Sequence, residues 1–266
     1  MRLTARTPSG LAYEAAGNGP NVLLMHSGLS DSRMWDPQWA ALTRSFHTIR
    51  YDARGFGSSA DPRRPYTLHG DGMDVLDALD IERAAIVGSS MGGYAALDMA
   101  IALPHRVSAL VVTGAAPSGW QHSAEMRAQW EAVDAAYERR GIDAANELEM
   151  KMWLDGPFRA PDVVDREVRR SVATVNAVLL DRQSAFKIEP GDLEPPAVDR
   201  LAEVRVPTLV ITGELDQPSI QGGSFEIARG AGAEHIEIPD AAHFPNLEQP
   251  AEFNRALIDF LERQIV

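Results

Sequence analysis

Short apolar runs alternate with amphipathic segments in the first and last parts of the chain. Runs of this length that are rich in β-branched residues are typical of buried strands. They predict strands at residues 11–17, 21–26, 46–51, 84–89, 107–113, 206–213 and 235–239. The last segment, Pro250 to Arg263, predicts a helix. Alternation of strands with helices predicts the α/β class, with a mostly parallel, twisted sheet covered by helices on both faces.

The middle of the chain, residues 117–200, has no strand pattern. Its apolar residues repeat at helical spacing, first over Met126, Trp130, Val133 and Tyr137 and then over Val164, Val168, Val172, Val175 and Leu179. Gly141 is placed to end the first helix, and Glu147 to Leu154 predicts a third, shorter helix. We therefore expect a helical insertion at 117–200 within one core made of residues 1–116 and 201–266.

The sequence Gly88-Ser89-Ser90-Met91-Gly92 has the form G-x-S-x-G and lies between a predicted strand and a predicted helix. A sharp turn of this kind holds its central serine with the hydroxyl exposed. Side chains at Gly88 or Gly92 would collide across the turn, which explains the two glycines. The alternative interpretation is a glycine-rich loop before a helix. The context favours Ser90 as a nucleophile.

A nucleophilic serine needs a base, and the base needs an orienting acid. Asp216 follows the predicted strand 206–213, and His243 lies in the loop after the strand 235–239. Catalytic groups of open α/β sheets gather at the carboxyl ends of the strands, so Ser90, Asp216 and His243 are expected to meet there. A single loop histidine is more often solvated, and Glu214 is the second candidate for the acid.

An oxyanion intermediate needs backbone N–H donors beside the nucleophile. Met91 supplies one at the start of the helix after the serine. The second donor is expected in the loop after the strand 21–26, where Gly28 is the first candidate and Leu29 the second. His26 lies at the end of that strand, and we interpret it as structural.

These motifs resemble the α/β-hydrolase superfamily over nearly the whole chain. Within it, the chain is similar to the 3-oxoadipate enol-lactonase and related esterase branch. The stretches that carry the resemblance are His26-Ser27-Gly28, Met34-Trp35-Asp36-Pro37-Gln38, Arg50-Tyr51-Asp52-Ala53-Arg54-Gly55, the Ser90 turn, Gly213-Glu214-Leu215-Asp216 and Ala242 to Pro250. The resemblance implies the α/β-hydrolase fold, with residues 117–200 as its helical cap. It also excludes the dehalogenases and epoxide hydrolases of this fold, because they have Asp where this chain has Ser90.

The chain departs from the lactonase pattern at two places. Gly28 stands where those enzymes carry Leu, which changes the wall of the pocket beside the oxyanion donors. The segment from Tyr66 to Ile81 contains Gly70 and Gly72, where the family has a longer continuous helix. These differences bear on the substrate rather than on the chemistry.

Apolar side chains of the insertion and of the site loops are candidates for the substrate pocket. They are Leu29, Trp120, Trp130, Trp153 and Phe244. The alternative for most of the insertion residues is packing of the cap onto the core. Arg127 and Arg159 are candidates to bind a substrate carboxylate, against the alternative of solvated surface arginines.

The chain has 266 residues and a formal net charge of −13. Nucleic acids and anionic membranes favour clustered Lys and Arg, so we expect neither as a partner. The absence of Cys excludes disulfides and zinc–thiolate sites, and the seven His are scattered, so we expect no metal. Met1 to Pro8 lacks the apolar core of a signal peptide. The expectation is a soluble, cytoplasmic protein, and the oligomeric state is left open.

The sequence therefore predicts a serine hydrolase that cleaves a small carboxylic ester or lactone through an acyl-enzyme, with no cofactor. One alternative is a carbon–carbon bond hydrolase of the same fold, although the glycine- and proline-rich oxyanion loop of that group is not matched by Gly28-Leu29-Ser30. The other alternative is a ligand-binding protein of this fold without catalysis.

Overall fold

One eight-stranded sheet forms the centre of the computed structural model, which describes residues 5–265. Its strand order is β1-β2-β4-β3-β5-β6-β7-β8. β2 runs antiparallel to both of its neighbours, β1 and β4, and the other neighbouring strands of the described sheet pair in parallel. The strands are β1 (Ala5–Arg6), β2 (Ala12–Ala16), β3 (Asn21–Met25), β4 (His47–Tyr51), β5 (Ala84–Ser89), β6 (Val107–Thr113), β7 (Thr208–Gly213) and β8 (Glu234–Ile238).

The predicted fold class is confirmed, and each predicted strand is present within one or two residues of its expected bounds. The structure has one further strand, β1, which the sequence pattern did not indicate. Two residues are too few to show an alternation, and β1 exists through its antiparallel pairing with β2. Residues 1–4, part of the segment in which we expect no signal peptide, lie outside the described residues.

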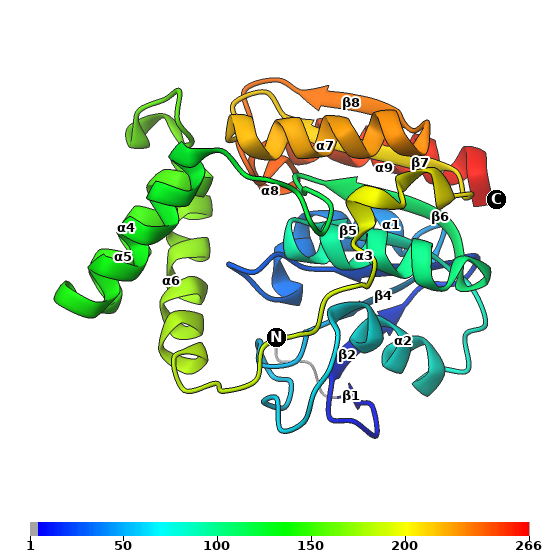
Figure 1. The fold of residues 1–266 in the computed structure, drawn as a ribbon. Coiled ribbons are helices and arrows are strands. Elements are labelled where there is room, and N and C mark those ends of the chain that lie inside the picture. The colour runs from blue at the N-terminus through cyan, green and yellow to red at the C-terminus, as the bar shows by residue number, and fades with distance from the viewer. Residues whose placement is uncertain (1–4, 266) are drawn as a thin grey trace.

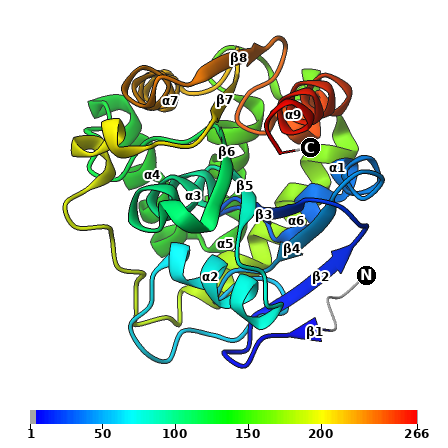
Figure 2. The same ribbon diagram turned by 90° about the vertical axis from the view of Figure 1, so that its right-hand side faces the viewer.

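Helices cover both faces of the sheet (Figure 2). On one face lie α2 (Leu68–Ala78), α3 (Met91–Ala102) and α7 (Pro218–Ala231), and on the other lie α1 (Asp36–Leu42) and α9 (Pro250–Ile265). The short α8 (Pro245–Glu248) precedes α9. No helix within residues 5–265 is long and apolar enough to cross a membrane.

The sequence explains why these elements pack as they do. Every residue of β5 and of β7 is buried, as expected for central parallel strands covered on both faces. In α9 the buried residues follow helical spacing, at Phe253, Leu257, Phe260 and Leu261. The helix α2 is continuous through both of its glycines. Gly72 faces Met25, where a Cβ would approach the methionine methyl group at 3.3 Å.

The connection from β6 to β7 is a helical insertion, which lies beside the sheet in Figure 1. It contains α4 (Ala124–Arg140), α5 (Ile142–Glu149) and α6 (Arg166–Gln183). The side chain of Ser123 accepts the N–H of Met126 at the start of α4, and Gly141, with φ +82°, follows its end. The domain bounds of 117 and 200 stay a prediction.

The third predicted helix differs from the expected one in position and in type. In place of a helix from Glu147 to Leu154, α5 ends at Glu149 and continues as a π-helix over Met150–Asp155. Gly156, with φ +74°, then ends it. A π-helix is wider than an α-helix and is frequent at functional sites.

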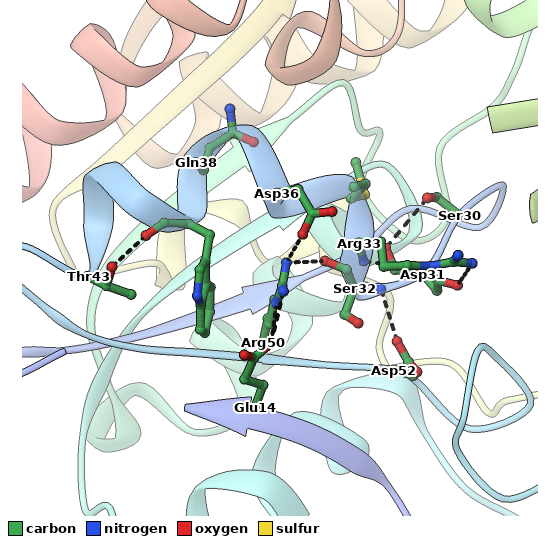
Figure 3. A network of polar contacts seen from close by, with 12 residues as sticks. Glu14, Ser30, Asp31, Ser32, Arg33, Asp36, Gln38, Thr43, Arg50 and Asp52 are labelled. Atoms are coloured by element: carbon green, nitrogen blue, oxygen red, sulfur yellow. Dashed lines mark hydrogen bonds and ion pairs between the residues drawn. The ribbon is translucent and has the colours of Figure 1, made fainter. Parts of the chain in front are cut away.

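The loop after β4 is held by the carboxylate of Asp52, which lies next to the ion pairs around Arg50 in Figure 3. Asp52 accepts the N–H of Ser32 at 2.9 Å and that of Ser58 at 2.7 Å. These bonds join the loop after β4 to the segment that follows β3. Residues 52–57 therefore form a structural turn that links these two loops.

The two ends of the insertion meet at Ser118. Its carbonyl oxygen accepts the N–H of Val198 at 3.0 Å, and its hydroxyl accepts the N–H of Ala197 at 2.7 Å. The same hydroxyl donates to the carboxyl group of Asp98 on α3 at 3.2 Å. Asp98 is 1% exposed, and burial raises its pKa to about 7. A buried acid therefore lies where the insertion joins the sheet.

Replacing Asp98 by asparagine is expected to stabilise the protein at pH 8. The folded state keeps the proton of Asp98 up to about pH 7, whereas an unfolded chain loses it near ~4. The part of the unfolding free energy that depends on this proton is fully present below the pKa of the unfolded chain, which is ~4. It is lost as the pH rises through the folded-state pKa of about 7. Asparagine keeps an acceptor for Ser118 without a charge.

The unfolding free energy of Asp98→Asn and of the wild type is to be measured in urea between pH 5 and pH 8. We expect the variant's advantage to grow with pH and to reach on the order of 2–4 kcal/mol at pH 8. An advantage that does not change over this range would contradict the assignment of the proton to Asp98.

Candidate active site

Ser90 lies in the sharp turn between β5 and α3. Its backbone has φ +53° and ψ −115°, an unusual conformation for a residue other than glycine. Its N–H donates to the carbonyl of Thr113 at 2.8 Å, and its carbonyl accepts the N–H of Tyr94 at 2.9 Å. A Cβ at Gly88 would overlap the carbonyl oxygen of Gly92. The glycine therefore permits the turn, which leaves Ser90 partly exposed.

The side chains of Ser90, His243 and Asp216 form one chain of hydrogen bonds. His243 Nε2 lies 2.8 Å from Ser90 Oγ. His243 Nδ1 lies 2.9 Å and 3.1 Å from the two carboxylate oxygens of Asp216. His243 is 0% and Asp216 1% exposed, whereas Ser90 is partly exposed. Among these three residues, solvent therefore reaches the hydrogen-bond chain at Ser90.

Two backbone features shape the surroundings of Asp216 and His243. The N–H of Gln217 donates to Asp216 Oδ1 at 2.7 Å, which fixes the carboxylate. Gly114 follows β6 with φ +53°, and a Cβ there would lie 3.4 Å from both Asp216 Oδ2 and His243 Nδ1. An ionised carboxylate only accepts, so His243 donates from Nδ1 and its Nε2 can accept the proton of Ser90.

The predicted oxyanion donors lie next to each other. A Cβ on Gly28 would be 3.8 Å from the side chain of Met91, so the loop after β3 approaches the start of α3. The N–H of Met91 is the first of that helix and has no partner within it. Leu29, the second candidate, is buried beside Gly28.

His26 has a structural place in this loop. Its Nε2 accepts the N–H of Ala53 at 2.9 Å, so its Nδ1 carries the proton that is donated to the carbonyl of Ser27 at 2.8 Å. The imidazole thus joins the loop after β3 to the loop after β4. Both ring nitrogens are used, which agrees with the structural interpretation of His26.

Two of the five predicted pocket residues contact the imidazole of His243. The ring of Trp153, on the π-helix, lies 4.4 Å from the imidazole between centroids, and the ring of Phe244 lies 5.3 Å away at a steep angle. Phe244 is completely buried and Trp153 is 7% exposed. Leu29 packs in the same apolar cluster as these two residues.

The other two predicted pocket residues make their contacts elsewhere. Trp120 donates its indole N–H to the carbonyl of Ser219 at 3.1 Å and lies against α7. Trp130, on α4, has its ring 4.9 Å from that of His122. Their pocket role stays a prediction.

Neither alternative for Arg159 describes its actual surroundings, because its guanidinium is buried and bound within the protein. It donates to the carbonyl oxygens of Leu154, Asp155 and Asp240 and pairs with Glu248. Arg127 is exposed and donates to the carbonyl of His122. The sequence pattern did not indicate this role of Arg159, because two of its partners, Asp240 and Glu248, lie 81 and 89 residues away.

The sequence pattern also did not identify Gly114 and Gln217 as residues that lie beside Asp216 and His243. A glycine directly after an apolar strand is a signal for a left-handed residue, and Gly114 follows the strand 107–113. For Gln217, the one feature of the sequence that could have indicated a role at the site is its place next to Asp216. Its amide donates to the carbonyl of Met152 at 2.7 Å and thereby joins the acid's loop to the insertion.

Known proteins resemble the chain over almost its full length. The 3-oxoadipate enol-lactonase 1 of Acinetobacter baylyi is 29% identical over 98% of this chain and 97% of its own. The 2-hydroxy-6-oxo-6-phenylhexa-2,4-dienoate hydrolase of Comamonas testosteroni is 25% identical over 95% of this chain and 91% of its own. The crystal structure of the enol-lactonase from Burkholderia xenovorans has a TM-score of 0.78 at 27% identity, covering 97% of this chain and 99% of that chain.

The sequence model described as "Alpha/beta hydrolase family" matches residues 22–256. That range runs from β3 into α9, and it includes the turn of Ser90 and the loops of Asp216 and His243. A match over this much of the sheet and its loops means that the chain belongs to the alpha/beta hydrolase family.

Proposed function

We propose that this protein is a serine hydrolase that cleaves a small carboxylic ester or lactone. The observation that carries the proposal is the hydrogen-bond chain from the partly exposed Ser90 through His243 to the buried Asp216. The lengths of the two links, 2.8 Å and 2.9 Å, suit a nucleophile, a general base and an orienting acid. The two similar enol-lactonases support a lactone as one substrate class.

In the first half of the proposed reaction, His243 Nε2 takes the proton of Ser90 as its oxygen attacks the acyl carbon. The carbonyl oxygen becomes an oxyanion, which the N–H groups of Gly28 and Met91 stabilise. Asp216 stabilises the imidazolium. The C–O bond of the ester then breaks, and the imidazolium gives its proton to the leaving alkoxide. In a lactone this alkoxide stays attached to the acyl group.

In the second half, His243 takes a proton from water, and the resulting hydroxide attacks the acyl-enzyme. The imidazolium returns that proton to Ser90 as the acyl–oxygen bond breaks and the carboxylic acid leaves. The products are one acid and one alcohol, or one hydroxy acid from a lactone, and no other reactant is consumed.

A carbon–carbon bond hydrolase is the second candidate, because the Comamonas testosteroni relative bears the name of a dienoate hydrolase. The loop after β3 argues against it. Its sequence, Gly28-Leu29-Ser30, does not match the glycine- and proline-rich oxyanion loop that the resemblance leads us to expect in that group.

The test begins with a fluorophosphonate probe, which labels activated serines covalently. We expect labelling of Ser90 in the wild type and none in Ser90→Ala. Hydrolysis of a panel of esters, lactones and vinylogous diketones then separates the candidates. Labelling together with ester or lactone turnover supports the proposal. Turnover of diketones alone favours the second candidate, and an unlabelled, inactive wild type favours a binding protein.

A further inference from the structure

Three successive backbone N–H groups around His243 have partners outside their own loop. Those of Ala242 and Phe244 donate to the carboxylate of Glu248, at 3.1 Å and 3.2 Å. That of His243 donates to the carbonyl of Trp153 at 3.2 Å. The backbone on both sides of the imidazole is therefore held by a single carboxylate, and the residue itself is held by the π-helix of the insertion.

Arg159 connects this carboxylate to the same π-helix. It pairs with Glu248, and both side chains are largely buried, at 9% and 5% exposure. It also donates to the carbonyls of Leu154 at 2.6 Å and Asp155 at 2.8 Å, at the end of the π-helix, where carbonyl oxygens lack a helical partner. A further bond of 2.9 Å reaches the carbonyl of Asp240, before His243 in the loop.

We propose that the Arg159–Glu248 pair is a positioning element that fixes the imidazole of His243 between Ser90 and Asp216. The role of His243 as a base rests on the proposed function, but the positioning itself does not. The pair touches neither Ser90 nor Asp216. It acts on the backbone N–H groups that flank His243 and on the π-helix whose Trp153 ring covers the imidazole.

The charges agree with this role. Burial raises the pKa of Glu248, and the guanidinium of Arg159 opposes that rise. The pair thus keeps a carboxylate in a buried place, where its two oxygens can accept several N–H groups at once. Without the guanidinium, the pKa of Glu248 rises further, and a protonated carboxyl has fewer acceptor sites for Ala242 and Phe244.

Arg159→Met tests the pair, because methionine keeps an apolar stem and removes every donor. Arg169→Met is the matched control. Arg169 also binds the π-helix, through two bonds of 2.9 Å and 3.0 Å to the carboxylate of Asp155, and its other ion-pair partner is Glu147. Both variants therefore remove an arginine that binds the π-helix, but only Arg159 also binds the loop of His243.

We expect Arg159→Met to lower kcat by about 10–100-fold with KM changed by less than about threefold, since a small displacement of a catalytic group affects the transition state more than binding. Arg169→Met is expected to keep kcat within about threefold of the wild type. Wild-type kcat in Arg159→Met, or an equal loss in both variants, would overturn the proposal.

Glu248 provides a second pair of variants if Arg159→Met does not fold. Glutamine keeps one acceptor oxygen for the N–H groups of Ala242 and Phe244, and alanine keeps none. The expected order of kcat is wild type, then Glu248→Gln, then Glu248→Ala. Equal kcat in the two Glu248 variants, or wild-type kcat in Glu248→Ala, would contradict the positioning role.

A measurement without turnover separates this inference from the proposed function. In protein with ¹⁵N-labelled histidine, the low-field proton resonance of the bond from His243 Nδ1 to Asp216 is assigned by its loss in His243→Gln. We expect it to broaden or disappear in Arg159→Met and to persist in Arg169→Met. Persistence in both would overturn the positioning role, whether or not the fluorophosphonate labels Ser90.

Discussion

Replacing Ser90 by alanine is expected to lower kcat by about 10⁶-fold, since loss of the nucleophile removes the acyl-enzyme route. The small residual rate comes from binding and from the oxyanion donors. The folded structure should survive, because the Ser90 contacts that fix the turn are made by its backbone N–H and carbonyl. Single-turnover hydrolysis of the best ester or lactone from the panel measures the effect.

Ser89→Ala is the control for this variant, since it removes a hydroxyl from the neighbouring residue. Ser89 is completely buried at the end of β5, whereas Ser90 is partly exposed. We expect Ser89→Ala to keep most of the activity. Substantial activity in Ser90→Ala, together with its loss in Ser89→Ala, would mean that the nucleophile has been assigned to the wrong serine.

Asp216→Asn is expected to lower kcat by about 10⁴-fold while the fold is kept. The amide group of asparagine can donate to His243 Nδ1, which then carries no proton and leaves the proton on Nε2. An imidazole with its proton on Nε2 cannot accept one from Ser90. The negative charge beside the imidazolium is lost as well. The effect is to be measured as kcat and kcat/KM for a neutral ester, with circular dichroism as the test of folding.

Glu214→Gln separates this assignment from that of the second candidate acid. The side chain of Glu214 is exposed and accepts the N–H of Asp240 at 3.1 Å. We expect kcat to stay within about threefold of the wild type. A large loss in Glu214→Gln, with Asp216→Asn near wild type, would identify Glu214 as the acid.

The fold could be predicted from the sequence because its signals are local. The runs that form β5 and β6 are mainly apolar, and the two glycines of the Ser90 turn, Gly88 and Gly92, lie at the end of β5 and at the start of α3. The same locality places Asp216 and His243 at loop positions after strands. That the three side chains share one edge of the sheet then follows from parallel strands alone.

The supports of the site could not be predicted, because they depend on contacts between distant segments. Arg159 and Glu248 are 89 residues apart, and nothing in either local sequence indicates the other. The π-helix has no distinctive pattern, because its apolar residues fit an ordinary α-helix equally well. A sequence reading can therefore name candidate catalytic groups at a site while leaving out the residues that orient them.

The bonds at Ser118 also bear on how relatives of this fold could diverge. Because Ser118 bonds to Ala197 and Val198, residues 119–196 form a loop whose two ends are adjacent. The closure entropy of such a loop depends only weakly on its length. Helices could be lengthened, shortened or exchanged in this segment without straining the strands, provided that Trp153 and Arg159 keep their bonds to the loop of His243. The remaining positions of the segment are therefore the natural place to engineer a new substrate range.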